Sequence, residues 1–207
     1  SEVSANKLLI SIGREPNVEN IGIENTDIRL HHDYIETNDM YQTSESHIYA
    51  IGDCIGGVQL AHVAAREGVI AIEHLAGLQP EKLDHHQIVK CVYSSPEIAS
   101  VGLTEDEAKA QNFDIKVGKI PFQANGKALI NRATEGFAKV IADAKTEDLL
   151  GVHLFGHHVT ELISEAGLAK VLDATPWEMS QTIHPHPSLS EIIGEAALAV
   201  DNLQFHF

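Results

Sequence analysis

The hydrophobic pattern of the chain changes near residue 80, and this change limits the folds that the chain can adopt. Before it, one stretch with helical spacing, from about residue 60 to 78, follows four short strand-like runs, LLISIG, TDIRL, YIET and IYAIG. After the polar linker GLQPEKLDHH come five further strand-like runs, IVKCVYS, IASVG, DIKVGKIPF, GFAKVIAD and LLGVHLFG. The pattern predicts part of an α/β unit followed by a separate α+β domain.

Helical patterns follow the last of these runs. Residues 160–172, 176–182 and 189–200 carry apolar side chains at three- and four-residue spacing, and Pro176 suits the first position of a helix. A Ser/Thr-x-x-Glu spacing, which predicts a helix N-terminus, begins at Ser94, Thr104, Thr175 and Ser188. We therefore expect a helical end to the second domain and a further helix after Thr104.

Composition excludes several classes of partner. With 43% hydrophobic residues among 207, the chain can bury a core, but its formal charge of −16 has the wrong sign for nucleic acid. No apolar run approaches the ~20 residues that span a bilayer. The start, SEVSANKLLISIG, lacks the order of a signal peptide, so we expect a cytoplasmic protein without a membrane partner. Because a strand pattern begins almost at once, we expect the chain to be part of a longer protein.

A first candidate site lies where the run IYAIG meets a glycine-rich bend. Gly52 would let a ligand approach the backbone, and the carboxylate of Asp53 could accept hydrogen bonds from hydroxyl groups. The helix that follows would point its free N-terminal amides at the same crevice, where negative charge is favoured. A simple turn beside a core helix is the alternative reading.

The stretch TIHPHPSLSE, residues 182–191, is the second candidate site. It could provide two metal ligands, a helix cap or a proton-transfer pair. His184 and His186 could chelate only if both rings faced one way, and no cluster of Cys or carboxylates completes a metal site at usual spacing, so we expect no metal there. Ser188 and Glu191 fit a helix cap. The cap does not explain why His186 stands directly before the N-terminus of that helix. We interpret His184 as a positioning residue.

Several blocks together resemble one enzyme family. These are ISIGREPN, IYAIGDCIGGVQLAHVAAREG, VYSSPEIASVGLTE, FQANGKAL, ELISEAGLAKVLDA and HPHPSLSE. Throughout, the chain is similar to the dihydrolipoamide dehydrogenases, which are FAD-dependent pyridine-nucleotide disulfide oxidoreductases. The resemblance implies that residues 1–14 end an NAD-binding domain, that 15–84 form the C-terminal part of an FAD-binding domain, and that 85–207 form an interface or dimerisation domain.

The resemblance also implies roles for individual residues. Gly13 matches a glycine that lies against NAD, and Asp53 matches the carboxylate that holds the ribityl chain of FAD. The segment beside the flavin is matched by Gln59, Leu60, Ala61 and His62, although the family usually has Met where Gln59 stands. His186 matches the general acid/base, and Glu191 its carboxylate partner.

Cofactors and partners follow from the same resemblance. It implies FAD and NAD in the full-length enzyme, a homodimer formed through residues after about 85, and a lipoyl-bearing acyltransferase of a 2-oxoacid or acetoin dehydrogenase complex as partner. In this family the enzyme oxidises dihydrolipoamide and passes electrons through a disulfide and FAD to NAD. Neither Gly-x-Gly-x-x-Gly nor Cys-x4-Cys occurs here. We therefore expect only a partial FAD site, and a fragment that is inactive alone.

Two alternatives remain open. Another member of the family, such as a glutathione reductase, resembles the chain around its HPxxxE motif, but the His-x-His-Pro form and the ELISEAGLA helix fit the lipoamide enzymes better. A mercuric reductase would end in a vicinal cysteine pair, whereas this chain ends in NLQFHF. The isolated fragment could also be a dimerisation module without catalysis of its own.

Overall fold

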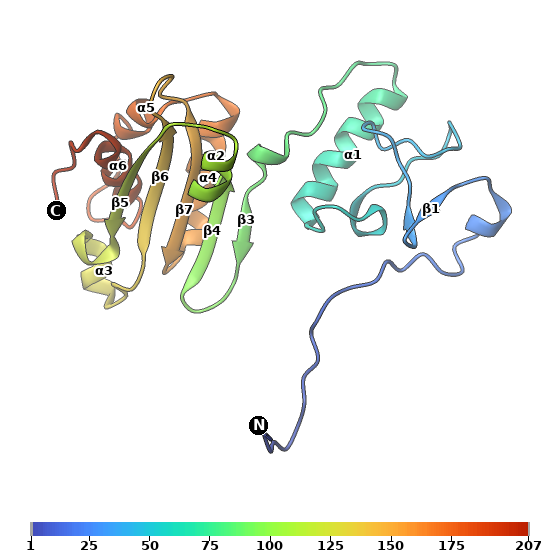
Figure 1. The fold of residues 1–207 in the computed structure, drawn as a ribbon, viewed down its shortest axis with the longest axis horizontal. Coiled ribbons are helices and arrows are strands. Elements are labelled where there is room, and N and C mark those ends of the chain that lie inside the picture. Colours follow the sequence, from blue (N-terminus) through green and yellow to red (C-terminus); the bar gives the residue numbers. More distant parts are fainter. Residues whose placement is uncertain (1, 207) are drawn as a thin grey trace. The chain divides into compact units, whose positions relative to one another are not determined.

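Residues 2–206 are described by the structure of the protein, a computed structural model, and they form two compact units. One unit ends at Leu83 and the other begins at Asp84 (Figure 1). The finer division of the first unit at residue 14 stays a prediction.

The first unit contains one long helix and little sheet. Its elements are the 3-10 turns η1 (Ile23–Asn25) and η2 (Gly52–Ile55), the strands β1 (Leu30–His31) and β2 (Tyr34–Ile35), and the helix α1 (Ala61–Leu75). The two strands pair antiparallel. Helix α1 confirms the predicted helix, and its buried residues Ile70 and Ala71 pack with Tyr41 in a small core.

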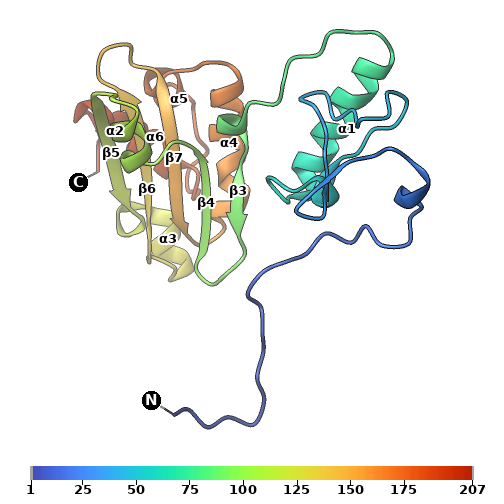
Figure 2. The same cartoon turned by 45° about the vertical axis from the view of Figure 1, so that its right-hand side comes forward.

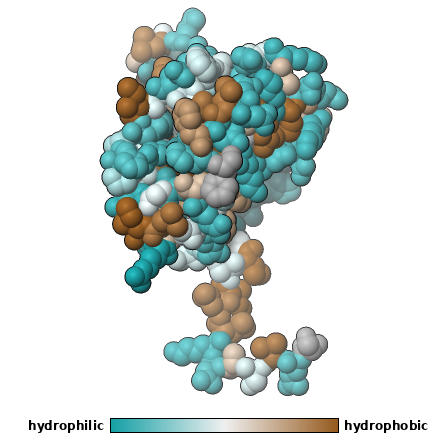
Figure 3. All heavy atoms as spheres, turned by 90° about the vertical axis from the view of Figure 1, so that its left-hand side faces the viewer, coloured by the Kyte–Doolittle hydropathy of each residue, from teal (hydrophilic) through white to brown (hydrophobic). Residues whose placement is uncertain are grey.

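Two of the predicted strands in this unit were wrong. The run LLISIG has no regular structure, and its apolar side chains are exposed, with Leu9 at 90% and Ile12 at 94% (brown spheres at the lower end of Figure 3). The run IYAIG makes a single bridge, between Gln42 and Tyr49. A strand needs a neighbour for its backbone N–H and C=O groups. In the described part of the unit no named strand pairs with either run, and IYAIG makes only short-range backbone–backbone bonds, such as those from the Thr43 N–H to the Ile48 carbonyl and from the Ala50 N–H to the Tyr41 carbonyl.

The second unit is built on a five-stranded antiparallel sheet with the order β3-β4-β7-β6-β5. Its strands confirm all five predicted runs, as β3 (Lys90–Val92), β4 (Glu97–Gly102), β5 (Ile115–Pro121), β6 (Phe137–Asp143) and β7 (Leu149–Gly156). In the central strands β6 and β7 most residues are buried, because helices cover the sheet. The predicted α+β domain is thereby confirmed.

Helices cover both faces of this sheet unequally. Figures 1 and 2 show α4 (Val159–Val171), α5 (Pro176–Ser180) and α6 (Glu191–Leu198) on one face, and the short α2 (Glu105–Ala110) on the other. Between the sheet and the larger helical layer lies the main core, which includes Val152, Ile163 and Ile192. A short helix, α3 (Gly126–Asn131), was not predicted. The remaining elements are the 3-10 turns η3 (His85–Gln87), η4 (Phe122–Ala124) and η5 (Ala199–Asp201).

The predicted helix starts have different outcomes. Thr104 and Thr175 each form a reciprocal capping box with the glutamate three residues later. The expectation for Ser94 was wrong, because Glu97 begins strand β4 and its carboxylate instead accepts hydrogen bonds from Thr160. The same Ser/Thr-x-x-Glu spacing thus precedes two helices and one strand. Pairing with the sheet outweighs the weak local preference for a helix start.

One glycine fixes how closely α6 approaches the sheet. A Cβ built on Gly118 of β5 would lie 2.1 Å from the carbonyl oxygen of Ala196, which no real side chain tolerates. Helix α6 therefore packs directly on the backbone of β5. This contact holds the helix that carries Glu191.

Candidate functional site

His186 and Glu191 form a hydrogen-bonded pair at the start of α6. The Nδ1 atom of His186 lies 2.9 Å from Oε1 of Glu191, and the histidine side chain is 78% exposed, whereas that of Glu191 is 29% exposed. Because Nδ1 faces the carboxylate, the Nε2 atom remains as the ring nitrogen that can exchange a proton. The arrangement is that of an imidazole held by a carboxylate.

The same carboxylate also receives the chain that enters the helix. The backbone N–H of Ser188 donates to Oε2 of Glu191 at 2.9 Å, while Oε1 faces His186. Partial burial of Glu191 opposes its ionisation, but the Ser188 N–H and the His186 ring outweigh burial and lower the pKa of this carboxyl group. The predicted cap at Ser188 was wrong, because α6 has Ser190 as its N-cap and no side-chain hydrogen bond caps it. Glu191 holds the backbone of Ser188 with one oxygen and the ring of His186 with the other.

His184 has a different partner from His186. Its Nε2 lies 2.8 Å from Oε1 of Glu165 on α4, and its side chain is only 9% exposed. The hydrogen bond that His184 donates to Glu165 raises the pKa of His184, against the opposing effect of burial. Glu165 lies 19 residues away in the sequence, and the helical pattern around it gave no sign of this role.

A cavity of about 250 Å³ lies beside His186 and Glu191. Asn125, at the N-terminus of α3, lines it and donates through Nδ2 to the carbonyl oxygen of Ser188 at 3.0 Å. Glu195, one turn after Glu191, and His206 also line it. A small substrate group could thus reach the exposed ring of His186 from this side.

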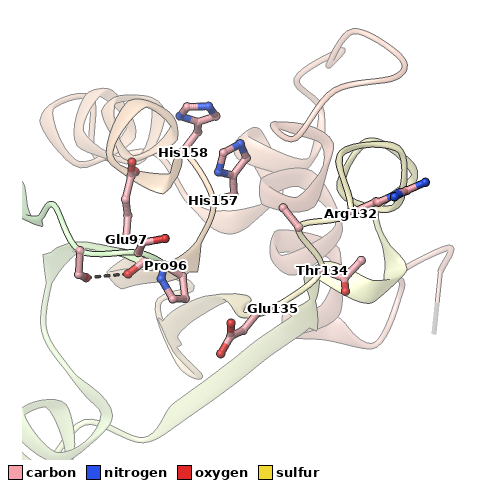
Figure 4. Close-up of a pocket in the computed structure, with 10 residues that line it drawn as sticks. Pro96, Glu97, Arg132, Thr134, Glu135, His157 and His158 are labelled. Atoms are coloured by element: carbon pink, nitrogen blue, oxygen red, sulfur yellow. Dashed lines mark hydrogen bonds between the residues drawn. The ribbon is translucent and has the colours of Figure 1, made fainter.

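A second cavity in the same unit, of about 490 Å³, contains none of the predicted site residues. His157 and His158 lie along its edge, but Glu97 is engaged with Thr160 and Arg132 points away from both histidines (Figure 4). Ionisation of Glu97 is opposed by burial, yet the Thr160 hydrogen bonds and the nearby histidines lower its pKa. This cavity offers no pairing like that of His186 with Glu191.

In the first unit, Asp53 lies beside the start of α1. Its carbonyl oxygen accepts a hydrogen bond from Gln59 Nε2 at 3.4 Å, and Gly52 lies so close to α1 that a Cβ there would be 3.2 Å from Cβ of Ala64. No side-chain hydrogen bond caps this helix at Leu60, within the described part of the chain. The structure thus brings the carboxylate-bearing turn and a helix N-terminus together.

The remaining predicted cofactor residues lie in or before this region. Ala61 and His62 open α1 directly after Leu60. Gly13 lies in the irregular N-terminal segment, where a Cβ built on it would meet no other atom within 4 Å beyond its chain neighbours. The next residue, Arg14, was missed by the sequence reasoning: its Nη1 lies 3.3 Å from Oδ2 of Asp53, in a pair exposed to solvent. The cofactor roles of these residues stay predictions.

The described residues offer neither a cluster of metal ligands nor a membrane-spanning helix. Between residues 2 and 206, no group of three or more His, Cys, Asp or Glu side chains is placed to hold a metal ion. His184 contacts Glu165, whereas His186 contacts Glu191. The two rings therefore do not point at one common metal position. None of the described helices is both long and apolar enough to cross a membrane.

Comparison with protein families divides the chain in a similar way. Residues 88–197 match the dimerisation domain of the pyridine nucleotide-disulphide oxidoreductases. Residues 1–68 match the pyridine nucleotide-disulphide oxidoreductase domain itself. The first match covers more than half of the chain and includes both His186 and Glu191.

Two curated relatives are similar along nearly the whole chain. The dihydrolipoyl dehydrogenase of Bacillus subtilis is 64% identical over 99% of this chain, and that of Zymomonas mobilis is 42% identical over 96%. In each case the match spans 43% of the relative. The chain therefore spans less than half the length of these proteins.

Solved structures show the same fold. LpdA from Mycobacterium tuberculosis has a TM-score of 0.85 at 32% identity, with 91% of this chain and 41% of that chain covered. The flavoprotein disulfide reductase RclA from Escherichia coli has a TM-score of 0.84 at 25% identity, with 93% and 44% covered. Taken with the domain matches, these similarities show that the chain belongs to the pyridine nucleotide-disulphide oxidoreductase family.

Proposed function

We propose that the chain is the C-terminal part of a dihydrolipoyl dehydrogenase, in which His186 and Glu191 are the acid/base pair. The single observation that carries this proposal is the 2.9 Å contact between His186 Nδ1 and Glu191 Oε1, beside a cavity and with the ring exposed. The names of the relatives that span the chain support the reaction class.

The chemistry suits an imidazole in this position. A thiol with a pKa near ~8.5 must lose its proton before it attacks a disulfide, and an imidazole with a pKa near ~6.5 can accept that proton at neutral pH. With Nδ1–H directed at Glu191, the proton is accepted at Nε2. Glu191 then stabilises the imidazolium, and Nε2 releases the proton when the ring returns to its neutral state.

FAD and NAD belong to this proposal as cofactors of the whole enzyme, where they would carry electrons from the dithiol. The residues present fit part of a flavin site. Asp53 offers a carboxylate for hydroxyl groups, and the N-terminus of α1, without a side-chain cap, offers amides to a negatively charged ring edge. Gln59, bound to the carbonyl oxygen of Asp53, would stand next to that edge.

We also propose that the second unit forms a homodimer and that the enzyme serves a lipoyl-bearing acyltransferase in the cytoplasm. Apolar side chains on α4 and at its C-cap remain exposed, with Leu168 at 60%, Val171 at 57% and the C-cap Leu172 at 67%. Symmetric pairing would remove this surface from water. His186, which is exposed here, would then face the disulfide and flavin of the other subunit.

Lipoamide-dependent reduction of NAD by the full-length protein tests the proposal. His186→Gln should retain flavin and dimer but lose much of the ~10²–10⁴ that general acid/base catalysis contributes. His47→Gln is the matched control, because His47 is exposed and lies in the first unit. Near-parental turnover in flavin-loaded His186→Gln would refute the assignment.

A further inference from the structure

His184 connects two helices of the second unit. Its side chain is almost fully buried, at 9% exposed, and its Nε2 contacts Glu165 on α4. On the other side, the ring lies against α6: a Cβ built on Gly194 would be 3.2 Å from both Cε1 and Nδ1 of His184. The histidine is therefore held between α4 and α6, two residues before His186.

The segment that carries His186 has few other attachments on this side. It runs between α5 and α6 without regular structure, and Ile183, directly before His184, is 97% exposed. Beyond His186, the backbone of Ser188 is held by Asn125 and Glu191. His186 thus lies between two anchors, and the first of them is the pair formed by His184 and Glu165.

Charges around His186 come from several elements. Helix α6 contributes Glu191, in contact with the ring, and Glu195, which lines the same cavity. The C-terminal segment contributes His206, whose Nδ1 lies 3.4 Å from Glu195. From its own segment comes His184, with Glu165 of α4 behind it.

His184 and Glu191 also affect each other electrostatically. The pKa of His184 is raised mainly by its hydrogen bond to Glu165, and also by the charge of Glu191. Although burial opposes it, the pKa of Glu191 is lowered, and the charge of His184 contributes to this shift. The four side chains therefore form one interacting set, Glu165–His184 and Glu191–His186.

We propose that Glu165 and His184 act as a positioning pair, which anchors the segment bearing His186 and supplies a positive charge that offsets Glu191. The inference rests on the proposed function and extends it to a residue, Glu165, outside the HPHP motif. Neither residue of the pair exchanges a proton with substrate. Their effect reaches the reaction through the position of His186 and the charge around it.

The two residues of the pair can be separated by isosteric changes. His184→Gln leaves the charge of Glu165 unbalanced, so the imidazolium of His186 is favoured and its titration moves to higher pH. Glu165→Gln removes one negative charge and lets His184 become neutral at a lower pH, so the net local charge above that pH is unchanged. The double variant is also neutral at these positions. Amide side chains can still hydrogen-bond across the pair in each variant.

Two measurements test the inference. The first is the pH titration of the ring resonances of His184 and His186 by NMR in this chain, which needs no cofactor. The second is the pH profile of kcat/KM for lipoamide-dependent NAD reduction by the full-length enzyme, which reports the ionisation of the free enzyme. Glu161→Gln is the matched control, since Glu161 is exposed and lies one turn before Glu165 on α4.

The expected pattern is specific. His184→Gln should raise the titration pH of His186 and move the acid limb of the profile in the same direction, while the double variant should return both toward the parent. Glu165→Gln should lower the titration pH of His184, and turnover should fall several-fold with flavin and dimer retained. Glu161→Gln should change neither titration.

Other outcomes would overturn the inference. An unshifted His186 titration in His184→Gln, or an unshifted His184 titration in Glu165→Gln, would show that the pair does not act as proposed. Loss of stability with no change in either pH profile would show a purely structural role. If His186→Gln keeps parental activity, the proposed function fails, but the NMR titrations still decide whether the two pairs interact.

Discussion

The carboxylate of Glu191 is divided between two partners, with Oε1 at 2.9 Å from His186 Nδ1 and Oε2 at 2.9 Å from the backbone nitrogen of Ser188. The second contact ties the carboxylate to the backbone of the segment that enters α6, independently of the ring. His186 therefore meets an acceptor that is already oriented. The helix start and the candidate site share one residue for this reason.

Glu191→Gln should lower turnover, but by less than His186→Gln. The amide can still accept a hydrogen bond from His186 or from Ser188, whereas the negative charge that stabilises the imidazolium is lost. Lipoamide-dependent NAD reduction, with flavin content checked, measures the effect. Glu191→Ala, which also removes the contact with the Ser188 backbone, should be slower and less stable than Glu191→Gln. Equal activity of the parent and Glu191→Gln would contradict the role of the charge.

The sequence predicted the parts of the fold that are decided locally or by strong patterns. The five strands of the second sheet were found because most of their apolar residues are buried against a helical layer, and Thr104 and Thr175 cap their helices as expected. LLISIG has the same strand-like composition, but without a paired neighbour it forms no strand. In the same way, Ser94 and Glu97 have the spacing of a helix cap, but Glu97 begins strand β4.

For the candidate site, the sequence predicted the residues that are close along the chain. His186 and Glu191 are five residues apart, so one turn of backbone brings them together. Glu165 reaches His184 across 19 residues, and Asn125 reaches Ser188 across 63. Contacts of this kind depend on how α3, α4 and α6 pack on the sheet, and no local pattern encodes that packing.

Asn125→Asp should loosen the segment after His186 while keeping helix α3. Oδ1 of Asn125 caps α3 by accepting the N–H of Ala128 at 2.9 Å, and its Nδ2 donates to the carbonyl of Ser188 at 3.0 Å. Aspartate caps equally well but cannot donate when ionised. Turnover should therefore fall several-fold, with little change in helix content.

Asn125→Ala is the comparison for this prediction. It removes both contacts of a side chain that is only 6% exposed, so loss of the cap alone should cost roughly 1 kcal/mol of unfolding free energy. Urea denaturation and circular dichroism measure the stability and helix content lost with the cap. The kcat value measures the effect of the lost contact with Ser188 on catalysis. If Asn125→Asp has parental turnover, the Ser188 contact does not position the site.

Leu168→Glu should weaken the proposed homodimer. Leu168 is 60% exposed on α4, and a charge there would have to be desolvated when a second copy covers this face. Ile72→Glu provides the control, because Ile72 is similarly exposed, at 64%, but lies in the first unit. Light scattering at tens of micromolar should show a smaller mass for Leu168→Glu alone. Equal masses for both variants would place the interface elsewhere.

Two histidines of the second unit should affect stability with opposite dependence on pH. Glu165 raises the pKa of His184, so the folded state binds this proton more tightly than the unfolded state. Its contribution is fully present below the unfolded value of ~6.5 and is lost as pH rises through the folded pKa. Burial lowers the pKa of His153, against the hydrogen bond to the carbonyl of Leu103, so its contribution is lost as pH falls below ~6.5.

Urea denaturation of the chain at pH values on both sides of ~6.5 can separate these contributions. His184→Gln should remove the part of the stability that declines toward alkaline pH, so the difference in unfolding free energy between parent and variant should be larger at low pH than at high pH. His153→Gln should have the reverse dependence, with the smaller difference at acid pH. Glu165→Gln should resemble His184→Gln, because His184 then loses the partner that holds its proton. A difference between parent and His184→Gln that stays constant across this range would mean that folding does not change the protonation of His184.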